Sequence, residues 1–134
     1  MARPLYISVH IPKTGGTSLN NELQRQIEGA STSDYADKPL SGQWRIACTR
    51  AWRRWRIPFH RNQILRDYRL IFGHFSADKY LPLGREHLFY LCFLRDPVER
   101  TVSHYHYWKN LTATRDPAEI QRQPLLKALI EDDL

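Results

Sequence analysis

The chain has 134 residues, which fits one domain with a single core and excludes a multi-domain organisation. It carries 20 Lys and Arg against 14 Asp and Glu, a formal net charge of +6. This balance favours anionic partners such as nucleotides, acidic sugars, nucleic acid or acidic membrane, and charge alone does not choose among them.

Cysteine content and hydropathy indicate the cellular compartment in which we expect the chain. Two cysteines, Cys48 in an expected helix and Cys92 in an expected buried strand, provide neither a disulfide framework nor a metal-ligand pair. No apolar run approaches the roughly 20 residues that span a bilayer, and the first residues leave no room for a signal peptide. We therefore expect a cytoplasmic chain without a transmembrane segment.

The first motif is LYISVHIPKTGGTSL, residues 5–19. Apolar residues alternate over 5–11 and predict a strand, the Lys-Thr-Gly-Gly-Thr-Ser segment predicts a tight loop, and residues 19–27 predict a helix. Two glycines let consecutive backbone N–H groups converge on an anion such as a phosphate. A lysine and two hydroxyls add donors to this candidate site, whose residues are Lys13, Thr14, Gly15, Gly16, Thr17 and Ser18.

Two other interpretations of the loop are weighed against this one. It is not the nucleotide-triphosphate loop, because Lys13 precedes the glycines instead of following them. A plain strand-to-helix turn, with Thr17 or Ser18 as N-cap, is the structural alternative. The stretch resembles the 5′-phosphosulfate loop of the sulfotransferases that use 3′-phosphoadenosine 5′-phosphosulfate (PAPS), in particular carbohydrate 2-O-sulfotransferases and their bacterial relatives.

The middle of the chain is read as a surface loop, a basic helix and a polar segment. Residues 29–42 are rich in Ser, Thr, Asp, Pro and Gly and predict a surface loop. Residues 44–56 predict an amphipathic helix with tryptophans on one side and arginines elsewhere. Either the tryptophans pack on the core with solvated arginines, or an arginine face of Arg50, Arg53 and Arg54 receives an anionic acceptor. Contact with nucleic acid or membrane is a third reading.

Two further strands follow. Residues 62–68 form a short polar segment, and residues 70–75 predict a strand that ends near His74. Residues 77–87 are expected as loop or short helix. The uninterrupted apolar run 88–94 predicts a third strand, central in the sheet because it is apolar on both faces.

The last part of the chain is expected to be helical. Asp96 is placed as N-cap, Pro97 at the first helical position and Glu99 in a capping-box-like arrangement, which predicts a helix to about Asn110. A similar start signal at Asp116 predicts a last helix toward Glu131.

Strands that alternate with helices predict an α/β fold, a P-loop-like parallel β-sheet flanked by helices. Ligands of such sheets bind at the carboxyl ends of the strands. All three expected strands end in or beside chemically useful residues, namely Lys13, His74 and Arg95. This coincidence of strand ends is stronger support for a site than any single motif.

The segment FLRDPVERTVSHY also resembles the sulfotransferase block that binds the 3′-phosphate of the donor. The resemblance assigns that role to Arg95 and Ser103. The structural alternative is that Arg95 pairs with Asp96 or Glu99 and that Ser103 is a surface hydroxyl.

His74 is the candidate general base, since a neutral imidazole can take the proton of an acceptor hydroxyl at neutral pH. The Gly-His-Phe-Ser stretch resembles the segment that supplies the catalytic histidine in carbohydrate 2-O-sulfotransferases, although Phe72 stands where another histidine is expected. A purely structural histidine is the alternative.

The resemblance implies transfer of a sulfuryl group from PAPS to a hydroxyl of a carbohydrate, with Lys13 stabilising charge on the bridging oxygen and no metal required. The basic helix favours an acidic carbohydrate as the acceptor, and we expect no nucleic-acid partner. A P-loop nucleotide kinase and a non-catalytic anion- or polysaccharide-binding module are the alternatives. Family members extend past this length, so residues 1–134 are expected to be one sulfotransferase-like domain, either truncated or naturally short. Acceptor identity and oligomeric state are not specified by the sequence.

Overall fold

The computed structural model describes residues 3–37, 43–84, 86 and 88–114. The chain divides into two compact units, the first ending at Leu94 and the second beginning at Arg95, and each is described here by itself.

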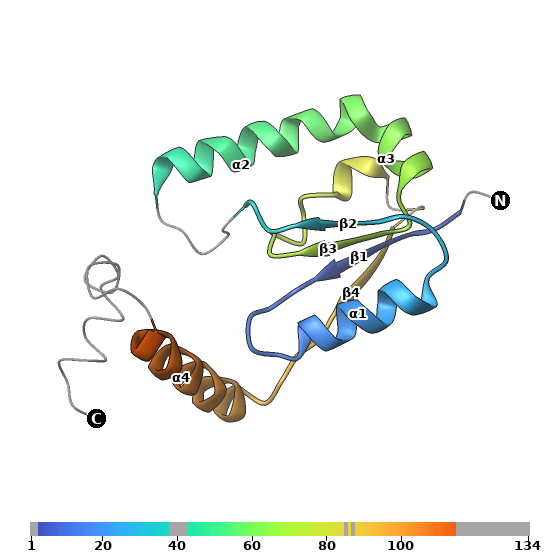
Figure 1. Ribbon diagram of the computed structural model, residues 1–134. Helices are drawn as coiled ribbons and strands as arrows, with labels where there is room; N and C mark the ends of the chain where they lie inside the picture. Colours follow the sequence, from blue (N-terminus) through green and yellow to red (C-terminus); the bar gives the residue numbers. More distant parts are fainter. Residues whose placement is uncertain (1–2, 38–42, 85, 87, 115–134) are drawn as a thin grey trace. The chain divides into compact units, whose positions relative to one another are not determined.

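The first unit is built on a four-stranded parallel sheet in the order β2-β3-β1-β4 (Figure 1). Its strands are β1 Leu5–Val9, β2 Ser31–Asp34, β3 Leu70–Gly73 and β4 Leu88–Cys92. Because β1 pairs with both β3 and β4, all four strands point the same way and their carboxyl ends share one edge. The predicted α/β fold with a parallel sheet flanked by helices is confirmed.

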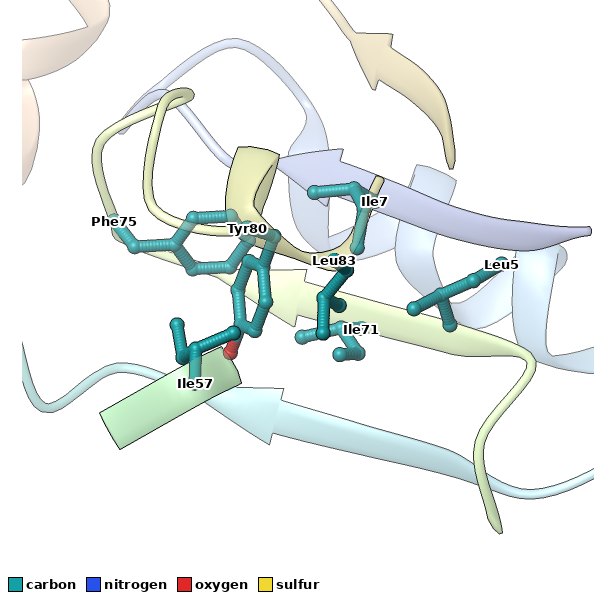
Figure 2. Close-up of a cluster of buried hydrophobic side chains, with 7 residues drawn as sticks. All are labelled: Leu5, Ile7, Ile57, Ile71, Phe75, Tyr80 and Leu83. Atoms are coloured by element: carbon teal, nitrogen blue, oxygen red, sulfur yellow. The ribbon is translucent and has the colours of Figure 1, made fainter. Parts of the chain in front are cut away.

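One face of the sheet carries the main hydrophobic core (Figure 2). Leu5 and Ile7 alternate along β1 and are fully buried, which is the period-2 pattern of a strand with one face inward. Ile71 from β3 lies in the same cluster, and the segments outside the sheet supply Ile57, Phe75, Tyr80 and Leu83.

The opposite face is covered by α1, Gly16–Gln26, which begins three residues earlier than the sequence predicts. Ser8 on β1 donates a hydrogen bond of 2.7 Å to Asn20 on α1, and both side chains are buried. Figure 1 shows α1 on the other side of the sheet from α2 and α3. This hydrogen bond therefore fixes the helix that follows the loop against the strand that precedes it.

Three consecutive helical segments follow β2: α2 Trp44–Arg56, the 3₁₀ helix η1 Ile57–His60 and α3 Arg61–Asp67. Of these, η1 and α3 supply residues to the core, whereas α2 has no buried residue. The α2 helix was predicted with these bounds. The short polar segment over 62–68, for which the sequence predicts no secondary structure, is mostly helical: it forms most of α3, whose Ile64 and Leu65 pack against the core. In the 77–87 region, η2 spans Leu81–Leu83.

The tryptophans of α2 do not pack on the core. Trp44, Trp52 and Trp55 are 70%, 54% and 64% exposed. The partly buried face of the helix instead carries Ile46, Arg50 and Arg53. The prediction that the tryptophans of α2 pack on the core is therefore wrong.

The prediction that 29–42 is a surface loop is also wrong in part, because it contains β2. This strand lies at the edge of the sheet, and backbone pairing with β3 holds it there although its side chains are polar. Its sequence, Ser-Thr-Ser-Asp, has no strand signal of its own. The pairing Asp34 with Gly73 aligns its carboxyl end with that of β3.

The prediction that the 88–94 strand is central is wrong. Among the described strands, β4 pairs only with β1 and forms the other edge. Phe89 is 56% exposed and Cys92, expected to be buried, is exposed as well. β4 is thus an edge strand although its residues are apolar, and the inner strands of the sheet are β3 and β1.

In its described part, the second unit contains one helix, α4 Pro97–Thr114. Asp96 caps it as predicted, because its Oδ1 accepts 3.0 Å hydrogen bonds from the backbone N–H groups of Val98 and Glu99. The predicted last helix, 116–131, lies outside the described residues. Among the described helices, none has both the length and the apolar character that crossing a membrane requires.

Candidate functional site

The loop between β1 and α1 makes a sharp turn at the carboxyl edge of the sheet. Gly15 has φ 84° and is the residue that caps α1, and Lys13 also has a positive φ, 68°. A left-handed lysine is uncommon, and such backbone strain concentrates at functional sites. The first helical hydrogen bond runs from the N–H of Leu19 to Gly15, so the N–H groups of residues 16–18 precede it at the positive end of the helix.

The loop hydroxyls have different surroundings. Thr14 is buried, and its Oγ1 donates a hydrogen bond of 2.8 Å to the carbonyl of Ile11, which closes the turn from within. Thr17 and Ser18 are exposed in the first turn of α1. Neither is the N-cap, because Gly15 holds that position without a side-chain cap. The alternative that Thr17 or Ser18 caps the helix is therefore excluded.

His10, directly after β1, packs against the loop. A β-carbon placed on Gly16 would lie 2.0 Å from Cδ2 and 2.4 Å from Nε2 of the His10 ring. The second glycine of the loop is thus required because the imidazole occupies the space of a side chain. The backbone N–H of His10 donates to the carbonyl of Gly73 at 2.8 Å, which ties the ends of β1 and β3 together.

Three rings from three neighbouring strand ends form a cluster, His10 after β1, Tyr35 after β2 and His74 after β3. The centroid of the His74 ring is 4.6 Å from that of His10 and 4.8 Å from that of Tyr35. The Tyr35 hydroxyl is 3.4 Å from Nδ1 of His10. Nε2 of His74 is buried and makes no hydrogen bond within the described residues. The histidine predicted as a base is therefore the inner ring of an aromatic cluster.

Burial lowers the pKa of both histidines. For His74 the cause is loss of solvation, and for His10 it is loss of solvation followed by the charge of His74. Each imidazole therefore stays neutral at pH 7, the form that accepts a proton. Two adjacent imidazoles also disfavour double protonation, so the pair holds a second proton poorly.

A buried ionic cluster lies at the end of β2. Nζ of Lys79 is 2.5 Å from Oδ2 of Asp34 and 2.8 Å from Oδ2 of Asp37, and the Tyr80 hydroxyl donates to Asp34 at 2.8 Å. Lys79 is only 6% exposed. Asp34 immediately precedes Tyr35, so these contacts hold the backbone from which Tyr35 reaches the two histidines.

Asp78 is a neighbouring carboxylate whose chemistry differs from that of the histidines. It accepts hydrogen bonds from Ser76 and Arg54, and these lower the pKa of the carboxyl, the Ser76 hydroxyl first. A carboxylate stabilised in this way is a weak proton acceptor. His74 is the stronger candidate base of the two.

Arg95 and Ser103 belong to the second unit. Nε of Arg95 donates to Oε2 of Glu99 at 3.1 Å, one turn along α4, as the structural alternative predicts. Glu99 accordingly faces Arg95 instead of completing a capping box. Ser103 is half-buried on the same helix. Both residues keep their assignment to a 3′-phosphate as a prediction.

The arginine face of α2 is largely occupied by acidic partners. Arg53 lies 3.6 Å from Asp37, and Arg54 pairs with Asp78. These arginines brace α2 against the segments after β2 and β3. The prediction that they receive an acceptor is therefore not supported by their contacts.

His10 and Tyr35 are the residues that sequence reasoning missed. His10 was counted as a strand residue, although β1 ends one position earlier at Val9. Tyr35 was hidden in a segment read as loop. A polar aromatic directly after each of β1, β2 and β3 is the available signal, because such positions meet at the carboxyl edge of a parallel sheet.

Among residues 3–37, 43–84, 86 and 88–114, no group of three or more His, Cys, Asp and Glu side chains is arranged to hold a metal ion. Comparisons of the chain with protein-family models, with curated proteins and with solved structures find no match.

Proposed function

We propose that this chain is a sulfotransferase that moves a sulfuryl group from PAPS to a hydroxyl of an acidic carbohydrate. The observation that supports it is the arrangement of the Lys13–Ser18 loop beside two neutral histidines at one edge of the sheet. An anion-binding loop next to a proton acceptor is the pairing that group transfer to a hydroxyl needs.

In this proposal the loop binds the 5′-phosphosulfate. The N–H groups of residues 16–18 and the hydroxyls of Thr17 and Ser18 contact the anion, helped by the positive end of α1. Lys13 stabilises the charge that develops on the oxygen between phosphorus and sulfur as that bond breaks. Arg95 and Ser103 bind the 3′-phosphate, an assignment that rests on the resemblance of their segment.

His74 accepts the proton of the attacking hydroxyl. Because Nε2 of His74 is covered in the ring cluster, catalysis through this atom requires the acceptor to displace part of that cluster. Tyr35 is the exposed member and the one that can move with the least loss of packing. The sulfuryl group then bonds to the acceptor oxygen, and adenosine 3′,5′-bisphosphate leaves with the electron pair of the broken bond.

The deciding experiment is a calorimetric titration with adenosine 3′,5′-bisphosphate, with and without magnesium, followed by an assay of sulfate transfer from labelled PAPS to a panel of hydroxyl acceptors. The proposal expects magnesium-independent binding and transfer. Binding that requires magnesium would indicate a nucleotide kinase, and binding without transfer to any acceptor would indicate a non-catalytic module.

A further inference from the structure

A second concave surface lies away from the ring cluster. It is a groove of about 350 Å³ between the last turns of α2, η1 and α3, lined in part by Trp52, Arg56, His60, Gln63 and Tyr68. Its volume is at the lower end of the roughly 300–1,000 Å³ range of small-ligand pockets. Aromatic faces, two guanidinium groups, an imidazole, an amide and two isoleucines thus line one depression.

The charge of Arg56 differs from that of Arg53, which also lines the groove but lies 3.6 Å from Asp37. The guanidinium of Arg56 lies 4.7 Å from the centroid of the Trp52 ring, and its Nη2 is 3.3 Å from Nε2 of His60. Among the described residues, no carboxylate lines the groove and no ion pair joins Arg56 to an acidic side chain. Arg56 is therefore a cation positioned by aromatic contacts and open to an external anion.

Aromatic and basic side chains also lie along the exposed face of α2, as far as its first residue. The guanidinium of Arg45 lies 5.5 Å from the centroid of the Trp44 ring, and the exposed Trp55 packs on Phe59 at 4.9 Å. At 1.5 Å per residue, the 13 residues of α2 extend this aromatic and basic surface over about 20 Å. An extended ligand fits such a surface better than a compact one.

We infer that the groove is a subsite for an anionic polysaccharide, with a sugar carboxylate on Arg56 and His60 and a sugar ring stacked on Trp52. This inference rests on the proposed function, since the acidic acceptor supplies the polymer. Guanidinium groups bind carboxylates through paired hydrogen bonds, and indole faces cover the C–H faces of sugar rings. The concave shape of the groove favours a polymer chain over a flat membrane surface.

The position of the groove determines what it does for the reaction. Tyr68 lines the groove just before β3, and His74 follows the same strand (Figure 1). Six residues separate Tyr68 from His74, and a chain of that length spans at most roughly 20 Å. We therefore expect the groove to contact sugars beside the one that reacts, and to raise the affinity for long acceptors without changing the transfer step.

Calorimetry with hyaluronan oligosaccharides, an unsulfated polymer that contains glucuronic acid, tests the subsite without the donor. Arg56→Ala should weaken binding by about tenfold or more, the usual loss for a charge-assisted contact. Trp52→Ala should weaken it as well, and Trp52→Phe should restore most of the affinity. Arg66→Ala is the matched control, because it removes the same charge from α3 at a residue paired with Asp67. That control should bind as the parent does.

The outcomes separate this inference from the proposed function. Loss of long-acceptor binding in Arg56→Ala, with unchanged turnover on a monosaccharide acceptor, supports both. Polysaccharide binding that depends on Arg56 in a chain without sulfate transfer retains the subsite and rejects the sulfotransferase. Equal binding by the parent, Arg56→Ala and Trp52→Ala overturns the subsite, as does tighter binding of single-stranded RNA than of hyaluronan. Circular dichroism of each variant confirms that it is folded.

Discussion

The imidazole of His10 occupies the place that a side chain on Gly16 would need, with its Cδ2 atom 2.0 Å from the position of a β-carbon there. Replacing glycine by alanine within a helix normally stabilises a protein by roughly 0.5–1 kcal/mol. Here the contact reverses the sign, because overpacking costs about 1–3 kcal/mol. The loop and the ring cluster are therefore coupled through this one contact.

Gly16→Ala should accordingly lower the free energy of unfolding by about 1–2 kcal/mol in urea denaturation. In a His10→Ala background the same substitution should be neutral or stabilising, since the ring that it meets is gone. The double-mutant cycle measures the coupling directly. An equal loss in both backgrounds would show that the two residues do not compete for space.

Lys13→Ala should abolish sulfuryl transfer and leave the fold intact, because a half-exposed loop lysine contributes little to packing. Transfer from labelled PAPS and urea denaturation measure the two properties separately. Lys13→Gly is a useful companion, since glycine relieves the positive φ at this position and should be at least as stable as the alanine variant. Normal turnover in either variant would remove Lys13 from the mechanism.

Arg95→Ala should weaken binding of adenosine 3′,5′-bisphosphate much more than binding of adenosine 5′-monophosphate, because only the first ligand loses a charge-assisted contact. Calorimetry with both nucleotides gives the ratio. Glu99→Gln is the matched variant, since it removes the carboxylate that Arg95 contacts at 3.1 Å and should leave or improve nucleotide affinity. Equal losses for both nucleotides in Arg95→Ala would identify the arginine as structural.

His74→Ala should reduce the transfer rate by roughly 10²-fold or more, the usual scale for a general base, with donor affinity nearly unchanged. In the parent the rate should fall on acidification with a midpoint below pH 6.5, because burial lowers the pKa of His74. Tyr35→Phe tests the cluster separately, since it keeps the ring and removes the hydroxyl near His10. A normal rate in His74→Ala would move the search for the base to His10, His104 or His106.

The same two histidines make stability depend on pH. Their folded-state pKa values are lowered, so the unfolded chain binds protons first as the pH falls. The free energy of unfolding should therefore be highest above pH 6.5 and decrease below it. Urea denaturation between pH 7.5 and pH 5 should show a smaller decrease in the His10→Phe, His74→Phe double variant. The pKa of Asp78 is lowered from 3.8, so the stabilisation from this carboxylate is present throughout this window and is lost only at lower pH.

Lys79→Met should destabilise the fold by about 3–5 kcal/mol, since it leaves the partly buried Asp34 without its cation and the buried Asp37 with only Arg53 at 3.6 Å. Arg66→Ala is the control, because an exposed ion pair contributes about 0–1 kcal/mol. Thermal or urea unfolding compares the two. A loss in Lys79→Met no larger than in the control would show that the cluster does not brace β2.

Sequence patterns predicted the elements that carry a local signal. Alternation marks β1, whose Leu5 and Ile7 are buried, and the Asp96 cap marks the start of α4 at Pro97. The bounds of α2 follow from helical spacing and from Pro58, although no residue of this helix is buried. β2 was missed because an edge strand is held by backbone pairing and by Asp34, which pairs with a lysine 45 positions away. The orientation of α2 was misjudged because Arg53 and Arg54 find acidic partners only in three dimensions.

The candidate site was predictable to a similar extent. Its loop is contiguous in sequence and was identified from spacing, and His74 from the end of a strand. Tyr35 and His10 join it only because β2, β3 and β1 are neighbours in the sheet, and strand order is not encoded in any one segment.

The pairing of β1 has a consequence for how the chain folds. Its two neighbours are β3 and β4, so Tyr6 pairs with Leu70 and Leu5 with Leu88. The strand that carries the loop thus has no sheet partner until most of the first unit has been synthesised. Pairing between such distant segments closes long loops, which slows folding. We therefore expect β1 to join the sheet only after β3 and β4 are available to pair with it.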